Sequence, residues 1–169
     1  RFAIAERVFR TAGDPENAIR AGVGLGWALI YQERYDAAID RLDRAAALHD
    51  SCCAARDDLL LLVELARAKY HAKTGDPVRA EAVALRIVDL RQRVGEEEPN
   101  QLADDWNRVG RARFDQGRYA EAGEAFRRCR EAAVAGSNTE IGALNNLAVV
   151  RRRLGCLLYT SDAADDGLC

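Results

Sequence analysis

The residues best suited to acid–base or metal chemistry are the two histidines, His49 and His71. A zinc site needs three or four His, Cys, Asp or Glu ligands brought together at characteristic spacings. Neither histidine has such neighbours. His49 is instead expected near the end of a helix, where a cation suits the helix dipole. We therefore expect no metal site, and no motif in the chain indicates another cofactor.

Five cysteines form the second group of reactive side chains: Cys52, Cys53, Cys129, Cys156 and Cys169. The adjacent pair at positions 52 and 53 could act as a redox pair, but no Cys-x-x-Cys or zinc-ligand spacing accompanies it. The simpler interpretation is that these thiols are small buried or turn residues in a reducing compartment. This interpretation favours a cytoplasmic location.

Motifs for nucleophilic or phosphate chemistry are also weak. Ser51 and Ser137 are expected in turns between helices, and neither lies in a nucleophile-elbow sequence. The segment Gly22-Val-Gly24-Leu-Gly26 has the glycine content of a phosphate-binding loop, but no strand precedes it and it falls inside a helix-forming stretch. We therefore expect that the chain is not an enzyme.

The composition predicts an all-α fold. Of the 169 residues, 49% are hydrophobic and 31% are charged, which is typical of a globular chain. Alanine, leucine, arginine and glutamate dominate, and all four are good helix formers. The net charge of −2 gives no general attraction for nucleic acid. No apolar run reaches the roughly 20 residues of a membrane-spanning helix, so no such segment is expected.

The same pattern of side chains occurs twice along the chain, which indicates an internal repeat. The first copy consists of Leu25, Gly26, Tyr35, Ala38, Leu42 and Ala45, and the second of Trp106, Val109, Gly110, Gly117, Tyr119, Ala122, Phe126 and Cys129. The interval from the glycine to the alanine is the same in both copies, and a large and then a small residue follow at further intervals of 4 and 3. Agreement over so many positions predicts two similar helical hairpins.

Each repeated position has a predicted structural role. The glycine lies where the second helix of the hairpin crosses the first, and the alanine that follows it lies at the same contact. A bulkier side chain at that alanine should cost about 1–3 kcal/mol through overpacking. Tyr35 and Tyr119 are expected to fill the gap between the two helices of their hairpin. Leu42 and Phe126 are expected to face the next hairpin, and the turn takes Gly117 in the second copy.

A divergent copy lies between these two. Leu65 and Ala66 correspond to the first-helix positions, and this helix should end at Gly75. Asp76-Pro77 then has the sequence of an N-cap followed by the first helical residue. Ala80, Ala84 and Ile87 would form the buried stripe of the second helix.

Partial copies occupy the two ends. Asp14-Pro15 predicts the start of a helix, and the residues before it have the spacing of a second helix whose partner precedes the sequence. Ser137 with Glu140 predicts a capping box at the start of a further first helix, which includes Leu147-Ala148 and reaches Gly155.

The pattern resembles the tetratricopeptide repeat family. The copies recur at intervals longer than the standard repeat of about 34 residues, as in the subgroup found in kinesin light chains and in sensor regions of bacterial regulators. The segments Gly95-Glu-Glu-Glu-Pro99 and Leu144-Asn-Asn-Leu-Ala148 are also similar to that subgroup. The resemblance covers residues 1–155 and implies a right-handed α-solenoid of antiparallel helix hairpins.

The resemblance also implies the organisation of the chain. The expected parts are residues 1–13 as the second helix of a truncated repeat, 14–52 as copy 1, 53–96 as divergent copy 2, 97–136 as copy 3, 137–155 as the first helix of copy 4, and 156–169 as a tail outside the repeats. Residues 156–166 match the conceptual translation of a transposase-type sequencing adapter, so we expect this tail to have no structural role.

In tetratricopeptide arrays the first helices line a concave groove in which peptides bind. Carried over to this chain, the groove residues are Trp27, Tyr31, Arg67, Tyr70, Asn107, Arg108, Arg111, Phe114, Asn145, Asn146 and Arg152. Arginine and asparagine side chains can hold a peptide backbone or carboxylate by hydrogen bonds, and arginine with aromatic residues is common at interface hot spots. The same residues could equally form the solvated face of amphipathic helices.

Three functions remain open at this point. The first is a protein-interaction scaffold that binds a peptide or a partner protein in the groove. The second is the sensor or regulatory region of a larger bacterial signalling protein, such as a transcription regulator or a serine/threonine kinase. The third, an RNA-binding helical repeat, needs a regular basic face, and only the arginines of the last two copies suggest one.

Overall fold

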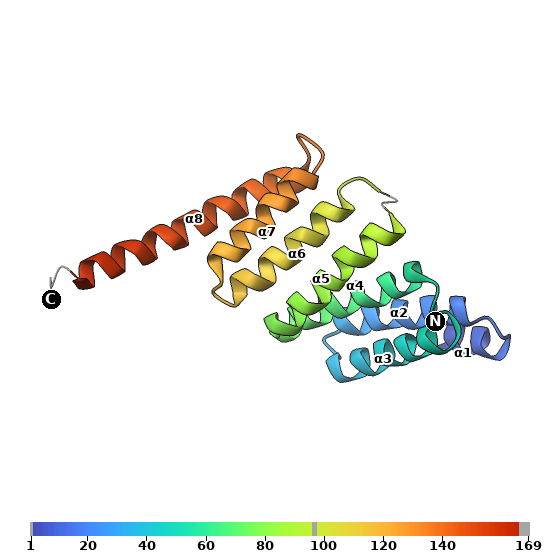
Figure 1. Cartoon of the computed structure of the whole chain (residues 1–169). Helices are drawn as coiled ribbons and strands as arrows, with labels where there is room; N and C mark the ends of the chain where they lie inside the picture. Colours follow the sequence, from blue (N-terminus) through green and yellow to red (C-terminus); the bar gives the residue numbers. More distant parts are fainter. Residues whose placement is uncertain (1, 96–97, 166–169) are drawn as a thin grey trace. The chain divides into compact units, whose positions relative to one another are not determined.

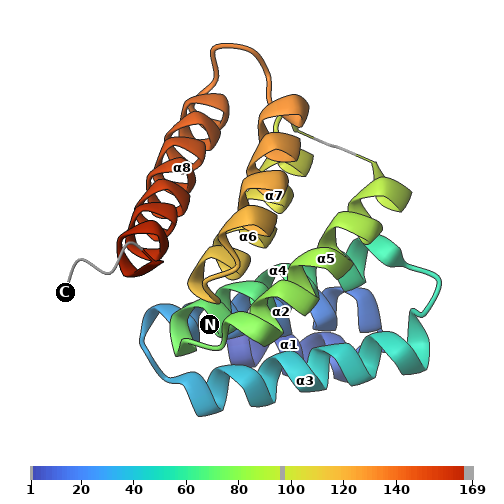
Figure 2. The same ribbon diagram turned by 60° about the vertical axis from the view of Figure 1, so that its left-hand side comes forward.

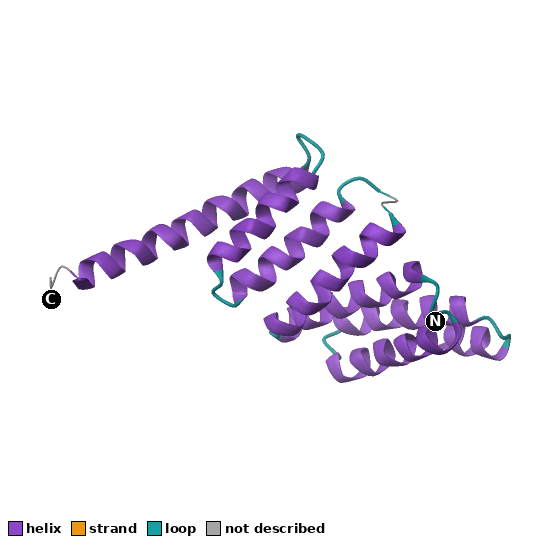
Figure 3. Ribbon diagram, in the orientation of Figure 1, coloured by secondary structure: helices purple, strands orange, loops and turns teal. Residues whose placement is uncertain are grey.

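The computed structural model describes residues 2–95 and 98–165, which form helices connected by short loops (Figures 1 and 3). The helices are α1 (Phe2–Thr11), α2 (Pro15–Tyr31), α3 (Tyr35–Cys52), α4 (Asp57–Thr74), α5 (Pro77–Val94), α6 (Gln101–Asp115), α7 (Tyr119–Ala132) and α8 (Asn138–Asp165). The described residues contain no strand. The prediction of an all-α chain is therefore confirmed.

The chain divides into two compact units. The first comprises residues 1–95 with α1–α5, and the second residues 96–169 with α6–α8. Within the first unit each helix packs on its neighbours in sequence, and α2 also packs on α4. Within the second unit α7 packs between α6 and α8 (Figure 2). Helices thus pack as neighbouring pairs in both units.

Two of the predicted helix starts are capped as the sequence suggests. The carboxylate of Asp14 accepts a hydrogen bond of 3.1 Å from the backbone N–H of Asn17, and that of Asp76 accepts one of 3.0 Å from the N–H of Arg79. A proline follows each aspartate at the first helical position. A side-chain acceptor there satisfies a backbone donor that has no partner inside the helix.

The start of α8 has the predicted capping serine. The N–H of Glu140 donates to Oγ of Ser137 over 3.2 Å. The carboxylate of Glu140 reaches back to the N–H of Gly136 over 2.7 Å, one residue before the expected partner. The capping box is therefore present in a slightly wider form.

The two repeated hairpins have matching turns. Glu33 has a φ of 59°, and Gly117, which lies at the same position in the second copy, has a φ of 75°. This left-handed conformation suits glycine and is uncommon for other residues. The backbone path of the turn is therefore the same in both hairpins although only one has the favoured residue.

Very close helix contacts lie at the two repeated glycines. A Cβ atom added to Gly26 would lie 2.6 Å from Cδ2 of Leu42, and one added to Gly110 would lie 2.5 Å from Cε1 of Phe126. Ala38 and Ala122, which follow the glycines in the same hairpins, are fully buried. The predicted role of these small residues is confirmed, because the second helix approaches the first too closely for a larger side chain.

The large residues at these crossings have a more local role than expected. Leu42 and Phe126 were predicted to face the next hairpin, yet each lies directly on the glycine of its own hairpin. They also belong to clusters that include the following hairpin's first helix: Leu59 of α4 is in the cluster of Leu42, and Val150 of α8 is in the cluster of Phe126. Each side chain therefore contributes to both contacts.

The repeated tyrosines differ from one another. The ring of Tyr119 lies 5.1 Å from that of Phe114 in the same hairpin, as predicted. The ring of Tyr35 instead lies edge-on to Tyr70 of α4, at 6.3 Å. This difference arises because α4 packs on both α2 and α3 and places an aromatic residue where Tyr35 can reach it.

The C-terminal helix extends further than the repeat pattern predicts. We expected the repeats to stop at Gly155, whereas α8 continues to Asp165, past the end of α7 (Figure 1). Residues 156–165 contain no proline or glycine, and leucine and alanine favour a helix there. Positions 96–97 of the acidic loop and 166–169 of the tail lie outside the described residues. Within the described part of the chain, no helix is long and apolar enough to cross a membrane.

The glycine contacts lead to a direct test of the fold. The change Gly110→Ala should lower the free energy of unfolding by about 1–2 kcal/mol, because overpacking against the buried Phe126 ring outweighs the gain in helix propensity. Gly142→Ala, also in a helix of the second unit, meets no atom within 4 Å and should be neutral or stabilising by up to about 1 kcal/mol.

Urea denaturation followed by circular dichroism measures both variants. The double variant Gly110→Ala/Phe126→Leu should recover part of the loss, because the smaller side chain makes room for the added methyl group. Equal effects of the two alanine substitutions would contradict the close helix contact.

Candidate functional site

A cleft in the first unit lies between α3 and α5 and has α4 as its floor. Its volume is about 460 Å³. The lining residues are Ile39 and Asp43 of α3, Glu64, Arg67, Tyr70 and His71 of α4, and Arg79, Ala82, Val83 and Arg86 of α5. Arg67 and Tyr70, which were predicted to share a groove with Trp27 and Tyr31 of α2, therefore line a cleft that α2 does not contribute to.

A buried carboxylate organises the floor of this cleft. The side chain of Glu64 is only 2% exposed, and its Oε1 lies 3.2 Å from Nη1 of Arg86 and 3.4 Å from Nη1 of Arg67. The other terminal nitrogen of Arg67, Nη2, lies 2.6 Å from Oδ1 of Asp43. A buried charge is costly unless it is paired and hydrogen-bonded. The two guanidinium groups supply that pairing and hold Arg67 between two carboxylates.

His71 lies beside this ion-pair cluster and is buried. Burial, which disfavours the imidazolium form, lowers the pKa of His71 below its ordinary value. The nearby Arg79 and Arg67 lower this pKa further, whereas Asp76 and Glu64 act in the opposite direction. The neutral imidazole is therefore the form that the folded cleft favours.

The remaining predicted residues of the first unit form an aromatic surface on α2 and α4. The rings of Trp27 and Tyr31 are stacked with their centroids 6.1 Å apart, and Tyr31 is 68% exposed. Nζ of Lys69 lies 5.8 Å from the centre of the Tyr31 ring. This geometry suits a cation–π interaction. The surface offers flat apolar contacts with a positive charge at its edge.

A second, smaller cleft lies between α6 and α8 of the second unit. Its volume is about 140 Å³, and its lining consists of Arg111, Phe114, Asp115, Phe126, Asn146 and Val149. Arg111, Phe114 and Asn146 were all predicted from the sequence to line a common surface, and the structure brings them together. Asn107, another predicted residue, accepts a hydrogen bond of 2.9 Å at Oδ1 from Nδ2 of Asn146.

The other predicted residues of the second unit lie outside this cleft. Nη1 of Arg108 is 2.6 Å from Oδ1 of the fully buried Asp105 of the same helix. Arg108 therefore compensates a buried charge, which gives it a structural role. Asn145 and Arg152 are exposed on α8 and are not part of the cleft lining.

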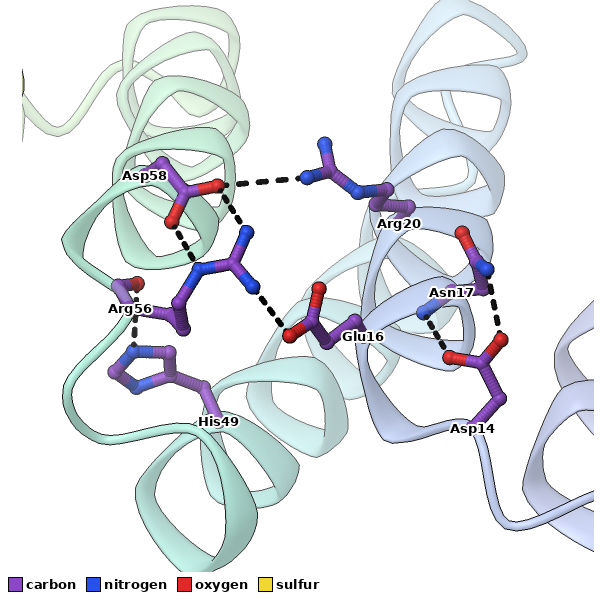
Figure 4. A network of polar contacts seen from close by, with 7 residues as sticks. All are labelled: Asp14, Glu16, Asn17, Arg20, His49, Arg56 and Asp58. Carbon is purple, nitrogen blue, oxygen red and sulfur yellow. Dashed lines mark hydrogen bonds and ion pairs between the residues drawn. The ribbon is translucent and has the colours of Figure 1, made fainter.

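A polar network joins the starts of α2 and α4 to the end of α3 (Figure 4). Arg56 donates from Nε and Nη2 to the two carboxylate oxygens of Asp58, at 2.8 and 2.9 Å, and from Nη1 to Glu16. Nε2 of His49 lies 3.2 Å from the backbone oxygen of Arg56. The hydrogen bonds from Arg56 also lower the pKa of Asp58. These contacts explain the position of His49 without any ligand role.

Three of the cysteines, Cys52, Cys53 and Cys129, have side chains that the structure describes. Cys53 and Cys129 are buried, and Cys52 is exposed. Burial raises the pKa of Cys53, and it raises the pKa of Cys129 to about 11. Both buried thiols therefore remain protonated near neutral pH and are poor nucleophiles. No group of three or more potential metal ligands occurs among the residues that the structure describes.

Two features of the first unit were missed from the sequence. The first is the cluster around Glu64, although a lone acidic residue within the apolar stretch from Leu59 to Leu65 marks a buried charge. Arg67, three residues later, is at the spacing of a helical ion pair. The second is the Arg56 network, whose partner Glu16 lies 40 positions away in the chain and leaves no local signal.

No protein-family model matches the chain, and no curated protein matches it.

The buried histidine leads to a test of pH dependence. The pKa of His71 is lower in the folded than in the unfolded chain, so the folded state favours the neutral imidazole. The contribution of His71 to the free energy of unfolding is therefore fully present above the unfolded pKa of about 6.5. That contribution is lost as the pH falls from there through the folded pKa. The fall in urea midpoint between about pH 7.5 and about pH 5.5 should therefore be larger for the unchanged chain than for His71→Gln.

The comparison isolates the effect of His71, because the two proteins differ at no other position. An identical pH dependence of the two urea midpoints would show that burial does not disfavour the charged form of His71.

Proposed function

We propose that the chain is a tetratricopeptide-type array of helical hairpins, a right-handed α-solenoid, that binds a peptide or a partner protein. The repeat interpretation is supported by the two glycine crossings. Leu42 follows Gly26 at the same interval in the sequence as Phe126 follows Gly110, and both pairs make the same close contact. Two hairpins with equal offsets and equal crossings are what stacked repeats require.

The cleft between α6 and α8 is the observation that carries the binding proposal. Arg111, Phe114 and Asn146, which the resemblance implies as groove residues, line it together. The exposed guanidinium group of Arg111 offers donors to a carboxylate or a main-chain carbonyl, and the amide of Asn146 can bond either group of a peptide bond. The Phe114 ring offers an apolar contact beside them.

The small volume of the cleft suits one anchoring side chain rather than a whole ligand. A peptide would place one residue there and continue along the neighbouring surface of the same unit. Binding of this kind usually rests on a few central residues. We expect a dissociation constant on the order of micromolar. A single side chain in a shallow cleft contributes little favourable free energy beyond the entropic and desolvation costs of association.

Peptide selection tests this function. A random peptide display library is panned on the immobilised chain, and recovered peptides are measured in solution by fluorescence anisotropy. The change Arg111→Glu should weaken binding by roughly tenfold or more. It removes a charge-assisted hydrogen bond and places a negative charge opposite the carboxylate of an acidic peptide. Asn146→Ala should weaken it by a smaller factor.

Arg127→Glu provides the matched control. Arg127 is an exposed arginine of α7 in the same unit, paired with Glu124, and it does not line the cleft. Binding should be unchanged in this variant. The proposal fails if no peptide is selected, or if the selected peptides bind Arg111→Glu as well as the unchanged chain.

A further inference from the structure

The cleft between α3 and α5 carries charges that the peptide-binding proposal does not use. Three arginines, at positions 67, 79 and 86, and two carboxylates, at positions 43 and 64, line it. The lining therefore has more guanidinium than carboxylate groups, and Asp76, which does not line the cleft, contacts Arg79. A lining with this surplus of arginines favours an anionic ligand.

The two carboxylates are already occupied. Asp43 contacts Nη2 of Arg67, and Glu64 contacts Nη1 of Arg67 and Nη1 of Arg86. Arg67 thus uses both terminal nitrogens inside the cluster and forms a fixed part of the floor. The attraction for an anion therefore falls to the other two arginines.

The guanidinium groups of Arg86 and Arg79 can donate hydrogen bonds to a ligand. The side chain of Arg86 is 54% exposed, and its ion pair with Glu64 involves Nη1. A guanidinium group has further N–H donors at Nη2 and Nε. The side chain of Arg79 is 75% exposed, and its contact with Asp76 is long, at 3.5 Å. The two arginines lie seven residues apart, which is two helical turns on one face of α5.

The space between these arginines is partly apolar. Ile39 of α3, Val83 and Ala82 of α5 and the ring of Tyr70 line it. A volume of about 460 Å³ lies within the range of small-molecule sites, which combine an apolar lining with a few polar groups. Glu64 also fixes one side of the Arg86 guanidinium group before any ligand arrives, which lowers the entropic cost of binding.

We propose that this cleft binds a small organic acid, whose carboxylate is held by Arg86 with support from Arg79 and whose apolar body lies against Val83 and Ile39. The site belongs to the first unit and is separate from the peptide-binding cleft of the second unit. The experiment below therefore tests it independently of the proposed function. A carboxylate fits the planar guanidinium group of Arg86 better than a point charge does.

The test uses benzoate and phenylacetate with their uncharged amides as matched controls. Binding to the ¹⁵N-labelled full chain is followed by amide chemical-shift changes. The acids should shift the signals of Val83, Arg86 and Tyr70, and the amides should bind at least about tenfold more weakly.

Variants locate the site. Arg86→Gln should weaken the binding of both acids by about tenfold or more, and Arg86→Lys should retain part of the affinity because it keeps the charge without the planar group. Arg93→Gln is the control: its side chain is 52% exposed on the same helix, pairs with Asp57 and Asp89, and does not line the cleft. Its affinity for the acids should be unchanged.

Three results would overturn the proposal. These are no shift with either acid at about 10 mM, equal binding of acids and amides, and equal affinity in Arg86→Gln and Arg93→Gln. A short acetylated peptide amide with one central glutamate serves as a further comparison. If it binds the cleft and the small acids do not, the site is a protein-interaction surface and the small-acid assignment is wrong.

Discussion

The fold depends on the contact between a glycine of one helix and a large side chain of the next. Gly26 with Leu42 and Gly110 with Phe126 bring the two helices of a hairpin closer than a larger residue at the glycine position would allow. This approach buries the alanines at positions 38 and 122 and sets the path of the short turn between the helices. Helix packing is sensitive to such contacts because protein interiors are close-packed and leave no room for an added methyl group. The glycine lowers helix propensity, so its presence at both crossings is a local cost offset by tertiary packing.

Both clefts follow from this arrangement of hairpins. Where α2 and α3 are held close together, α4 packs on both and becomes the floor below α3 and α5. In the second unit α7 lies between α6 and α8 and supplies Phe126 to the cleft lined by those two helices. The same ring therefore touches Gly110 and lines the cleft. Close helix packing and the candidate binding surface thus share a residue in the second unit, and a change at Phe126 should affect both.

The features predicted well from the sequence are those with a local or periodic cause. The caps at Asp14 and Asp76, the glycine crossings and the buried stripe of α5 all rest on residue types at short fixed spacings. The site was predicted only in part, because helical spacing gives the face of a residue but not the partner that it meets. Arg67 was assigned to a groove, whereas Asp43, 24 positions earlier, draws it toward α3. The end of the repeat pattern at Gly155 does not mark the end of a helix, since α8 continues to Asp165 through residues that favour a helix.

Among the residues that the structure describes, a buried acid followed by an arginine three residues later occurs in each unit, and the paired arginine has a structural role. Glu64 holds Arg67 on α4, and Asp105 holds Arg108 on α6. Each acid is nearly inaccessible, so removal of its arginine would take away part of the pairing of a buried charge, which costs more than the loss of a surface ion pair. A ligand that competes for such an arginine would pay the same cost. Ligand binding should therefore fall to donors that do not pair with a buried carboxylate, such as those of the exposed Arg111 and the Nε and Nη2 donors of Arg86, whose Nη1 pairs with Glu64.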